Sequence, residues 1–331
     1  MSRIGTIGAG SFGTALAVAL TGKGHEVILW DVDKDHLYEL KTYNENRRYL
    51  PGVLFNEKLA IGESVEETLE GADIALFAAP AQHFRGALLN AAPYLRENMV
   101  IVNVAKGIEQ KTLKRMSEVA WEIVPELRYT ALSGPSHAEE VGRLLPTTVA
   151  AASKDVKAAE YVQDVFMTDR LRVYTNHDVA GVEFGGSLKN IIALGAGISD
   201  GMGYGDNAKA AMMTRGIAEM ARLGVKLSAE AKTFSGLTGI GDLIVTCTSM
   251  HSRNRRCGIM IGEGASPKDA VKKIGMVVEG IFTTEAAYEL AQKVGVEMPI
   301  TESIFGVIGG KIKARDAVDS LMRRDRKHEG E

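Results

Sequence analysis

Residues 3–20, "RIGTIGAGSFGTALAVAL", decide the fold of this chain. A short apolar run typical of a strand is followed by Gly8, Gly10 and Gly13 in G-x-G-x-x-G spacing, and then by a run typical of a helix. In this context the first glycine permits a tight turn, the second lets backbone amides approach a pyrophosphate, and the third lets the helix pack on the strand. The stretch predicts a dinucleotide-binding turn, and the alternative is a glycine-rich turn without a ligand.

The pattern that begins here continues through the first half of the chain. Apolar runs typical of strands lie at residues 4–8, 26–30, 73–80, 99–105, 129–134, 147–153 and 171–175. Segments of helical length, such as 11–24 and 112–124, separate most of them. Because the runs are apolar throughout and alternate with helices, they predict a mostly parallel, doubly wound sheet that is covered on both faces.

From about residue 178 the alternation stops, and the periodicity is helical, as in residues 207–224 and 283–295. We therefore predict an α/β Rossmann-type domain over residues 1–180, followed by an all-α domain over residues 181–331. The junction between the two is the expected place for a site, because ligand clefts form preferentially between domains.

Composition narrows the class of function. A net charge of −3 offers no basic field to nucleic acid or to an anionic membrane, and no segment is apolar for long enough to span a bilayer. No secretory signal is visible before the first strand. We therefore expect a cytoplasmic protein without membrane insertion and without a nucleic-acid partner.

The two cysteines, Cys247 and Cys257, are too few for a disulfide framework, which favours a reducing compartment. Together with His251 they suggest zinc at first sight. However, the sequence has no C-x-x-C pair and no evident fourth ligand, so we expect no metal site.

An acidic residue follows the second predicted strand, in the run "VILWDVD" at residues 27–33. Asp31 stands where a carboxylate would accept hydrogen bonds from the adenosine ribose, and it would repel a 2′-phosphate. Asp33 either adds to this repulsion or caps a helix that begins near Lys34, the nearest cation in the sequence. The run favours NAD(H) and leaves NADP(H) as a possible second cofactor.

A lone lysine interrupts the apolar run "EFGGSLKNIIALGAGISDG" at residues 183–201. Buried lysines are costly unless they are paired, so Lys189 either extends its ammonium group to the surface or serves a site. Alcohol oxidation needs a base for the hydroxyl proton, and ketone reduction needs an acid. A lysine whose pKa is lowered by burial can act as both, and composition alone leaves the two interpretations open.

Other polar residues follow predicted strands, where ligands collect in an open α/β sheet. Lys106 follows the fourth apolar run, and Gly134 and Ser136 lie at the end of the fifth. Ser136 alternatively caps the next helix, and a cap is compatible with a ligand contact. Asp242, which follows a glycine pair, is either a helix cap or a site carboxylate.

The run "SRNRR" at residues 252–256 concentrates three arginines in a mildly acidic chain. Ser252, Arg253 and Asn254 suit a phosphate, because arginine offers a fork of donors and the other two offer hydrogen bonds at a helix start. The alternative is a solvated basic face. The serine and asparagine beside Arg253 favour the anion site.

Seven blocks of sequence stand out in this order: "GAGSFGTALA" (8–17), "AKGIE" (105–109), "SGPSHAEE" (133–140), the run over 185–216, "GIGDLIVTCTSMHSRNRR" (239–256), "VVEG" (277–280) and "GVEMPITE" (295–302). Together they closely resemble the bacterial-type NAD(P)-dependent glycerol-3-phosphate dehydrogenases over nearly the whole chain. The blocks around Lys189 and Arg253 are much more specific than the glycine fingerprint.

The resemblance implies interconversion of sn-glycerol 3-phosphate and dihydroxyacetone phosphate, in a cytoplasmic homodimer that supplies the backbone of phospholipids. It implies that Lys189 is the proton acceptor and that Lys106 touches both cofactor and substrate. The family's other substrate contacts match Gly134, Ser136, Asp242, Ser252, Arg253 and Asn254. Its cofactor contacts match Ser11, Phe12, Tyr49, Ala138, Arg253, Val277 and Glu279, beside the glycines and Asp31 named above.

One departure concerns the cofactor. Many members of the family carry Arg or His near the end of the second strand, whereas residues 30–33 here read "WDVD". The alternatives to the family function are a β-hydroxyacid or 6-phosphogluconate-type dehydrogenase, which also pairs a dinucleotide domain with a helical one, and a catalytically silent NAD-sensing protein. The "SRNRR" block opposes the first, and the intact Lys106 and Lys189 oppose the second.

Overall fold

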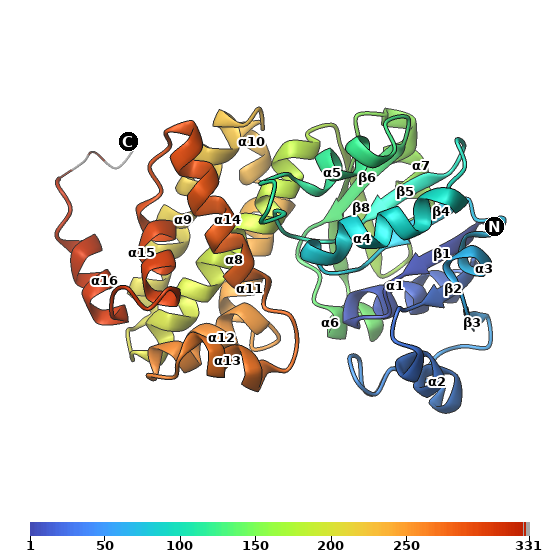
Figure 1. The fold of residues 1–331 in the computed structure, drawn as a ribbon, viewed down its shortest axis with the longest axis horizontal. Coiled ribbons are helices and arrows are strands. Elements are labelled where there is room, and N and C mark those ends of the chain that lie inside the picture. Colours follow the sequence, from blue (N-terminus) through green and yellow to red (C-terminus); the bar gives the residue numbers. More distant parts are fainter. Residues whose placement is uncertain (327, 329–331) are drawn as a thin grey trace.

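The structure is a computed structural model that describes residues 1–326 and residue 328. Figure 1 shows two regions side by side along the longest axis, a sheet region that holds the N-terminus and a helical region. The last strand ends at Asn176, and helix α8 (Val179–Gly201) follows it. The predicted fold class is confirmed, because a mostly parallel sheet covered by helices precedes a part of the described chain that has helices only.

The sheet has the strand order β3-β2-β1-β4-β5-β6-β7-β8, and all neighbouring strands are parallel except β6 and β7. The strands are β1 (Arg3–Ile7), β2 (Glu26–Trp30), β3 (Leu59–Ile61), β4 (Ile74–Phe77), β5 (Val100–Asn103), β6 (Arg128–Ser133), β7 (Thr147–Ala152) and β8 (Leu171–Asn176). The chain order reverses between β1 and β4. In open sheets, ligands bind beyond the carboxyl ends of the strands at such a switch point.

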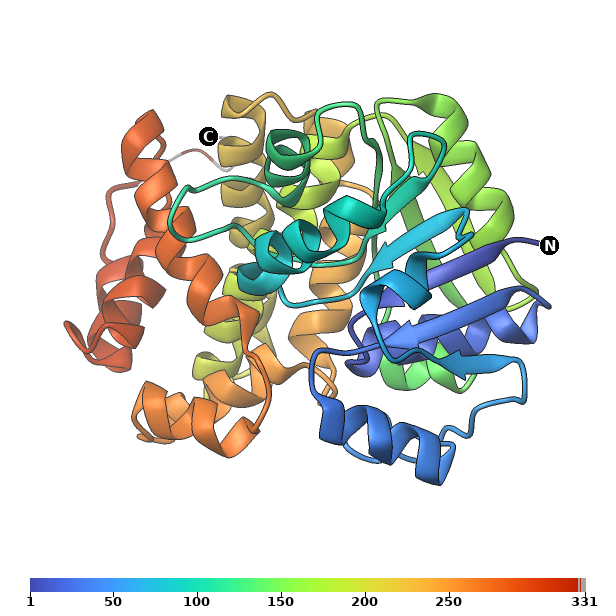
Figure 2. The same ribbon diagram turned by 45° about the vertical axis from the view of Figure 1, so that its right-hand side comes forward.

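Helices cover both faces of the sheet (Figure 2). Apolar side chains of α1, α2, α6 and α7 pack in one core with one face, and those of α3, α4 and α5 pack in another core with the opposite face. These helices are α1 (Ser11–Gly22), α2 (Lys34–Tyr43), α3 (Val65–Leu69), α4 (Ala81–Ala91), α5 (Met116–Ile123), α6 (Ala138–Gly142) and α7 (Val156–Phe166), with a short 3-10 helix, η1 (Ala92–Tyr94), after α4. Burial on both faces explains the apolar residues of the central strands β4 and β5, whereas the edge strand β8 alternates buried and exposed residues.

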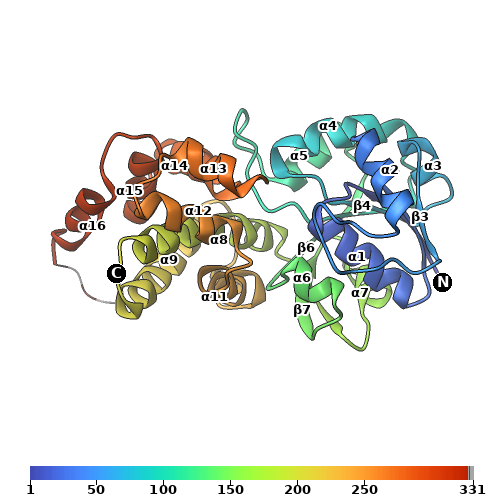
Figure 3. The ribbon, with the colours of Figure 1, turned by 90° about the horizontal axis from the view of Figure 1, so that it is seen from below.

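The helical region is built around α8, which is buried along most of its length and packs against α9, α11, α12 and α14 (Figure 3). Its other elements are α9 (Asp206–Lys226), α10 (Ala231–Phe234), a π-helical turn η2 (Leu237–Gly241), α11 (Asp242–Thr248), α12 (Arg253–Gly262), α13 (Pro267–Ile274), α14 (Glu279–Val294), α15 (Pro299–Ile308) and α16 (Ala314–Met322). Within the described residues, none of the helices combines the length and the apolarity that crossing a membrane requires.

Two details of the fold differ from the sequence prediction. The three-residue strand β3 was not predicted, because so short a segment shows no periodicity. The helix predicted over 112–124 begins only at Met116, since Leu113 has a φ of +59° and the chain turns there. The division at residues 180 and 181 stays a prediction, and residues 327 and 329–331 of the second predicted domain lie outside the described residues.

Candidate active site between the sheet and the helical region

The glycine loop joins β1 to α1 at the switch point of the sheet. Gly8 has a φ of +108°, which favours glycine, and a Cβ on it would lie 2.9 Å from the carbonyl carbon of Ala78. At the start of α1, no side chain of the described residues caps the helix, and the space beside Gly10 is open. Uncapped N–H groups at Ser11 and Phe12, facing an open turn, suit a pyrophosphate.

Asp31 lies beside this loop. Its Oδ2 accepts a hydrogen bond from the backbone N–H of Ala9 at 2.7 Å, and its Oδ1 accepts one from the N–H of Asp33 at 3.1 Å. Asp33 caps α2 by accepting from the N–H groups of Asp35 and His36, which confirms that interpretation. The proposed contact of Asp31 with a ribose stays a prediction.

Lys106, Lys189 and Asp242 form one charge cluster where the two regions meet. Asp242 accepts from Lys106 Nζ through Oδ2 at 2.7 Å and from Lys189 Nζ through Oδ1. Lys106 also donates to the carbonyl oxygen of Gly134 at 2.9 Å, and Lys189 donates to Thr246 Oγ1 at 2.7 Å. Only 5% of Lys189 is exposed, so the alternative that it reaches the surface is wrong.

Four different elements position the cluster. Lys106 follows β5, Gly134 follows β6, and Lys189 lies in the middle of α8. Asp242 is the first residue of α11, directly after the π-helical turn η2, and its carboxylate bonds to the lysines while Gly241 occupies the N-cap. The capping alternative for Asp242 is therefore wrong, and the carboxylate joins the sheet region to the helical region.

The charged groups of the cluster shift one another's pKa values. Burial lowers the pKa of Lys189 to about 8, although Asp242 acts in the opposite direction, and Lys106 lowers it further. Burial opposes ionisation of Asp242, but the two lysines outweigh this effect and hold the pKa of the carboxyl below its usual range. Near neutral pH, Lys189 therefore exchanges its proton much more readily than an exposed lysine does.

The turn after β6 supplies Gly134 and Ser136. Gly134 has a φ of +137°, and its carbonyl oxygen accepts from Ser136 Oγ at 2.9 Å as well as from Lys106. The following helix, α6, begins at Ala138 with His137 at its N-cap, so Ser136 does not cap it and that alternative is wrong. The structure thus places Ser136 within the turn that adjoins the cluster.

The residues of the "SRNRR" run do not form a solvated face. Ser252 is buried and caps α12 by accepting from the N–H of Arg255, whose guanidinium pairs with Asp200. Asn254 is also buried, and its amide bonds to Asn190 and to Gly280 N–H, so both ends of the amide are engaged by the protein. The alternative of a solvated basic face is therefore wrong.

Arg253 begins α12 and has a half-buried side chain. Its guanidinium makes no hydrogen bond or ion pair with another side chain among the described residues. Burial lowers the pKa of Arg253, and Glu279 and Glu139 oppose this effect. A fork of donors without such a partner next to the site suits an anion.

The remaining predicted cofactor residues lie at the start of α14 and in the turn after α2. Glu279 begins α14 and accepts from the N–H of Ala81 at 3.0 Å through Oε1, while its buried Oε2 has no hydrogen-bond partner among the described residues. Burial raises the pKa of this carboxyl. Val277 lies just before α14, and Tyr49 packs edge-on against His36 at 5.0 Å between ring centroids.

Sequence reasoning missed three polar residues of the site. Thr246 accepts from Lys189, and Asn190 Oδ1 accepts from Asn254 Nδ2 at 2.9 Å. His137 Nε2 is buried without a hydrogen-bond partner in the described part of the chain, and burial lowers the pKa of His137, with the charge of Lys189 lowering it further. For the last two, the only signal was their position in the chain, next to Lys189 and next to Ser136.

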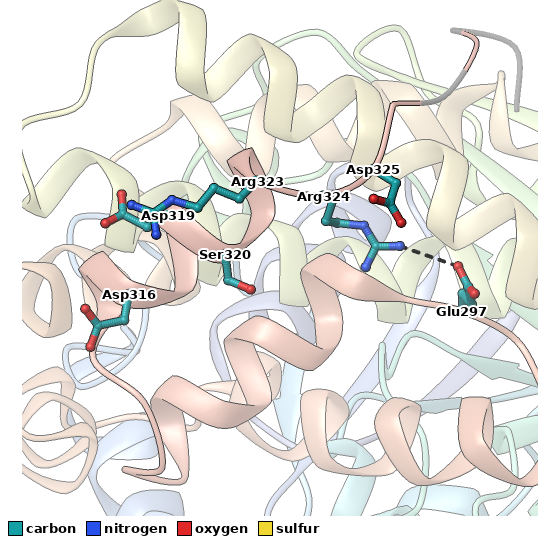
Figure 4. Close-up of a pocket in the computed structure, with 7 residues that line it drawn as sticks. All are labelled: Glu297, Asp316, Asp319, Ser320, Arg323, Arg324 and Asp325. Atoms are coloured by element: carbon teal, nitrogen blue, oxygen red, sulfur yellow. Dashed lines mark hydrogen bonds and ion pairs between the residues drawn. The ribbon is translucent and has the colours of Figure 1, made fainter.

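Two other features do not belong to the site. Among the described residues, no group of three His, Cys, Asp or Glu side chains could hold a metal ion. A hollow of about 730 Å³ lies along α16, at the end of the helical region away from the sheet (Figure 1), and only polar and charged side chains line it (Figure 4). The lining residues are Glu297, Asp316, Asp319, Ser320, Arg323, Arg324 and Asp325.

Two family models cover this architecture. The model described as the N-terminus of NAD-dependent glycerol-3-phosphate dehydrogenase matches residues 3–159, and the model described as its C-terminus matches residues 178–319. The chain belongs to the NAD-dependent glycerol-3-phosphate dehydrogenase family. The first match ends within α7, and the second begins at residue 178, directly before α8.

Individual glycerol-3-phosphate dehydrogenases are similar over their whole lengths. The enzyme named glycerol-3-phosphate dehydrogenase (NAD(P)+) from Bacillus velezensis is 51% identical over 100% of this chain and 97% of its own. The protein of the same name from Bacillus subtilis is 50% identical with the same coverage. The crystal structure of glycerol-3-phosphate dehydrogenase from Coxiella burnetii matches with a TM-score of 0.95 at 38% identity, over 98% of this chain and 99% of that one.

Proposed function

We propose that this chain interconverts sn-glycerol 3-phosphate and dihydroxyacetone phosphate by hydride transfer with NAD(H), and that NADP(H) is a possible second cofactor. The chain belongs to this family, and one observation on its structure supports the proposal most directly. A buried lysine, Lys189, shares the carboxylate of Asp242 with Lys106 beyond the carboxyl ends of the strands, next to a glycine loop that fits a pyrophosphate.

The proposed chemistry assigns proton transfer to Lys189. In the oxidising direction neutral Lys189 accepts the proton of the C2 hydroxyl, and in the reducing direction the ammonium form returns it to the C2 oxygen. Asp242 holds Lys189 Nζ in place and stabilises its charged form. Lys106 Nζ, fixed by Asp242 and the Gly134 carbonyl, polarises the same oxygen and draws the charge of the alkoxide toward it.

The phosphate of the substrate belongs at the start of α12. Arg253 offers an unpaired fork, and Ser136 and Ser252 offer hydroxyl groups near it in our proposal. We assign Asn254 a positioning role and no direct phosphate contact. Its amide is already occupied by hydrogen bonds to Asn190 and to the backbone N–H of Gly280.

For the cofactor, we assign the pyrophosphate to the glycine loop and the adenosine ribose to Asp31. The nicotinamide supplies or accepts the hydride when it is bound. Glu279 fits its carboxamide, because Oε2 is a buried acceptor without a hydrogen-bond partner in the described chain. Ser11, Phe12, Tyr49, Ala138 and Val277 complete the proposed cofactor contacts. A cytoplasmic homodimer that supplies glycerol 3-phosphate for phospholipid synthesis remains part of the proposal and follows from the family resemblance.

One experiment tests the proposal and its rivals together. The absorbance of NADH and of NADPH is followed with dihydroxyacetone phosphate, with dihydroxyacetone, and with the keto forms of 2- and 3-hydroxy acids. We expect turnover of dihydroxyacetone phosphate only, with NADH preferred by about ten- to a hundredfold in kcat/KM, since Asp31 repels a 2′-phosphate in a partly open groove. Turnover of a hydroxy-acid pair would favour the β-hydroxyacid dehydrogenase alternative, and cofactor binding without turnover would favour the NAD sensor.

A further inference from the structure

The guanidinium group of Arg48 contacts Asp33, two residues after Asp31, which the sequence did not predict. Lys34 is the nearest cation in sequence, but it is exposed, and the cation in contact with Asp33 is Arg48. Arg48 Nη1 lies 2.8 Å from Asp33 Oδ2, and Nη2 lies 3.0 Å from Glu39 Oε1. Two carboxylates therefore hold the fork in one orientation.

The segment that carries Arg48 is fixed to the glycine loop. Asn46 is fully buried and donates to the carbonyl oxygen of Ala9 and to Thr14 Oγ1, both at 2.8 Å. Its Oδ1 accepts from the N–H of Tyr49, whose ring packs against His36. Residues 46–49 are thus one tight turn against the loop, and the position of Arg48 follows from that turn.

Asp31 and Arg48 are linked through Asp33. Asp31 is bound to the loop through Ala9, and it is bound to Asp33 through the N–H of that residue. The side chain of Asp33 in turn holds Arg48. A ribose whose hydroxyls meet Asp31 would direct a 2′ substituent outward, toward Asp33 and the guanidinium.

We propose that Arg48 is the residue that accepts a 2′-phosphate in this chain, and that Asp33 limits this affinity by competing for the same guanidinium. The inference rests on the proposed function, because it assigns a role within the cofactor site. It explains how a chain with an acidic run at residues 30–33, which repels a 2′-phosphate, can also use NADP(H). Arginine is suited to the task, since its planar fork bonds a phosphate with two donors.

Two variants at the contact between Arg48 and Asp33 should change NADPH binding in opposite directions. Arg48→Met removes the fork and should weaken NADPH binding by about tenfold, which corresponds to the loss of one exposed charge-assisted contact. Asp33→Asn keeps the helix cap, because asparagine caps as well as aspartate, but it removes a negative charge and releases Nη1 of Arg48, while Nη2 stays paired with Glu39. It should strengthen NADPH binding several-fold.

Binding is measured directly, without turnover, by the fluorescence of NADPH and NADH on the full chain and by calorimetry with 2′,5′-ADP and ADP. The matched control is Arg47→Met, because the neighbouring Arg47 pairs with Glu45 and lies over the Tyr43 ring, 3.8 Å from its centroid. NADH and ADP should bind all variants within about twofold, which also shows that the variants are folded.

The outcomes separate the inference from the function on which it rests. Loss of NADPH and 2′,5′-ADP binding in Arg48→Met, with gain in Asp33→Asn and no change in Arg47→Met, supports the role of Arg48. Unchanged NADPH binding in Arg48→Met, or equal losses for NADH and NADPH, overturns it while the proposed function stands. Failure of the unmodified chain to bind either cofactor overturns both.

Discussion

At Lys189, burial and a carboxylate act in opposite directions on one ammonium group. Burial favours the neutral amine, and Asp242 favours the cation. The resulting pKa of Lys189 is about 8. A lysine without the carboxylate would be neutral and could donate no proton. A lysine at the surface would be charged and could accept none. Both forms are accessible near neutral pH because burial, helped by Lys106, outweighs Asp242 but does not cancel its effect.

Lys189→Met should reduce the rate constant of hydride transfer by about two to four orders of magnitude, the usual range for a positioned acid–base group. NADH binding should change little, because Lys189 is assigned to proton transfer and not to a contact with the cofactor. Single-turnover absorbance measures the rate, and the exposed Lys226→Met serves as control. Turnover that survives within a few-fold would make Lys106 the first candidate instead.

The direction of reaction should set the sign of the pH dependence. Ketone reduction needs protonated Lys189, so its single-turnover rate should fall as the pH rises through about 8. Alcohol oxidation needs the neutral amine, so its rate should rise through the same range. Asp242→Asn removes the carboxylate that raises the pKa of Lys189, and it should move both midpoints to lower pH. Midpoints that do not move in this variant would contradict the assignment.

Arg253→Lys keeps the positive charge but loses the fork of donors. The contact with the substrate phosphate should weaken, and the loss should be shared between KM and kcat if the phosphate also orients C2. Steady-state kinetics with dihydroxyacetone phosphate measure both constants. Dihydroxyacetone should be a very poor substrate of the unmodified chain, and comparable turnover of the two compounds would exclude a phosphate site.

At the scale of elements, the π-helical turn η2 delivers Asp242 to the lysines. The turn can approach α8 because Gly185 has no side chain, and a Cβ there would lie 2.5 Å from the carbonyl oxygen of Thr238. A wider turn in place of an α-helical one changes the direction in which the first residue of α11 points. The close approach of backbone to backbone therefore contributes to the geometry of the charge cluster.

Gly185→Ala should push η2 away from α8 and destabilise the fold by about 1–3 kcal/mol, the usual cost of overpacking. Activity should fall as well, because Asp242 moves with the turn. The control is Gly22→Ala, at the end of α1, where an added Cβ meets nothing within 4 Å. Urea unfolding and turnover are measured on both variants, and equal effects would show that the approach at Gly185 does not matter.

At the scale of the whole molecule, Glu183 ties the first turns of α8 to the sheet region. The carboxylate is buried and accepts hydrogen bonds from Arg115 Nη1 at 2.8 Å, Ser117 Oγ at 2.6 Å and Tyr129 Oη at 2.8 Å. It also accepts from the N–H of Ser117 at 2.8 Å. Since Lys189 lies less than two turns further along α8, this anchor sets the position of the lysine relative to the strands.

Glu183→Gln should lower the free energy of unfolding by about 2–4 kcal/mol, because Arg115 loses its buried partner and one donor faces another. Urea unfolding followed by circular dichroism measures the change. The exposed Glu66→Gln on α3 should shift stability by less than about 0.5 kcal/mol. Equal midpoints for the two variants would mean that the junction does not depend on this carboxylate.

The sequence by itself determined the fold class and the family. Local periodicity and turn chemistry carry that information, because a glycine fingerprint between a strand and a helix needs only neighbours in the chain. Lys189 and Arg253 stood out for the same reason, since each is a polar residue that breaks a local pattern. The helix cap at Asp33 could likewise be predicted from neighbouring residues in the chain.

Only the tertiary structure decided which residues meet. Asp242 lies 53 positions from Lys189 and 136 positions from Lys106, and no local pattern relates them. The same holds for Arg48, which is 15 positions from Asp33, while Lys34 is adjacent to it. Pairings of this kind depend on how helices and strands pack, and the side chains that share one partner are known only after the chain has folded.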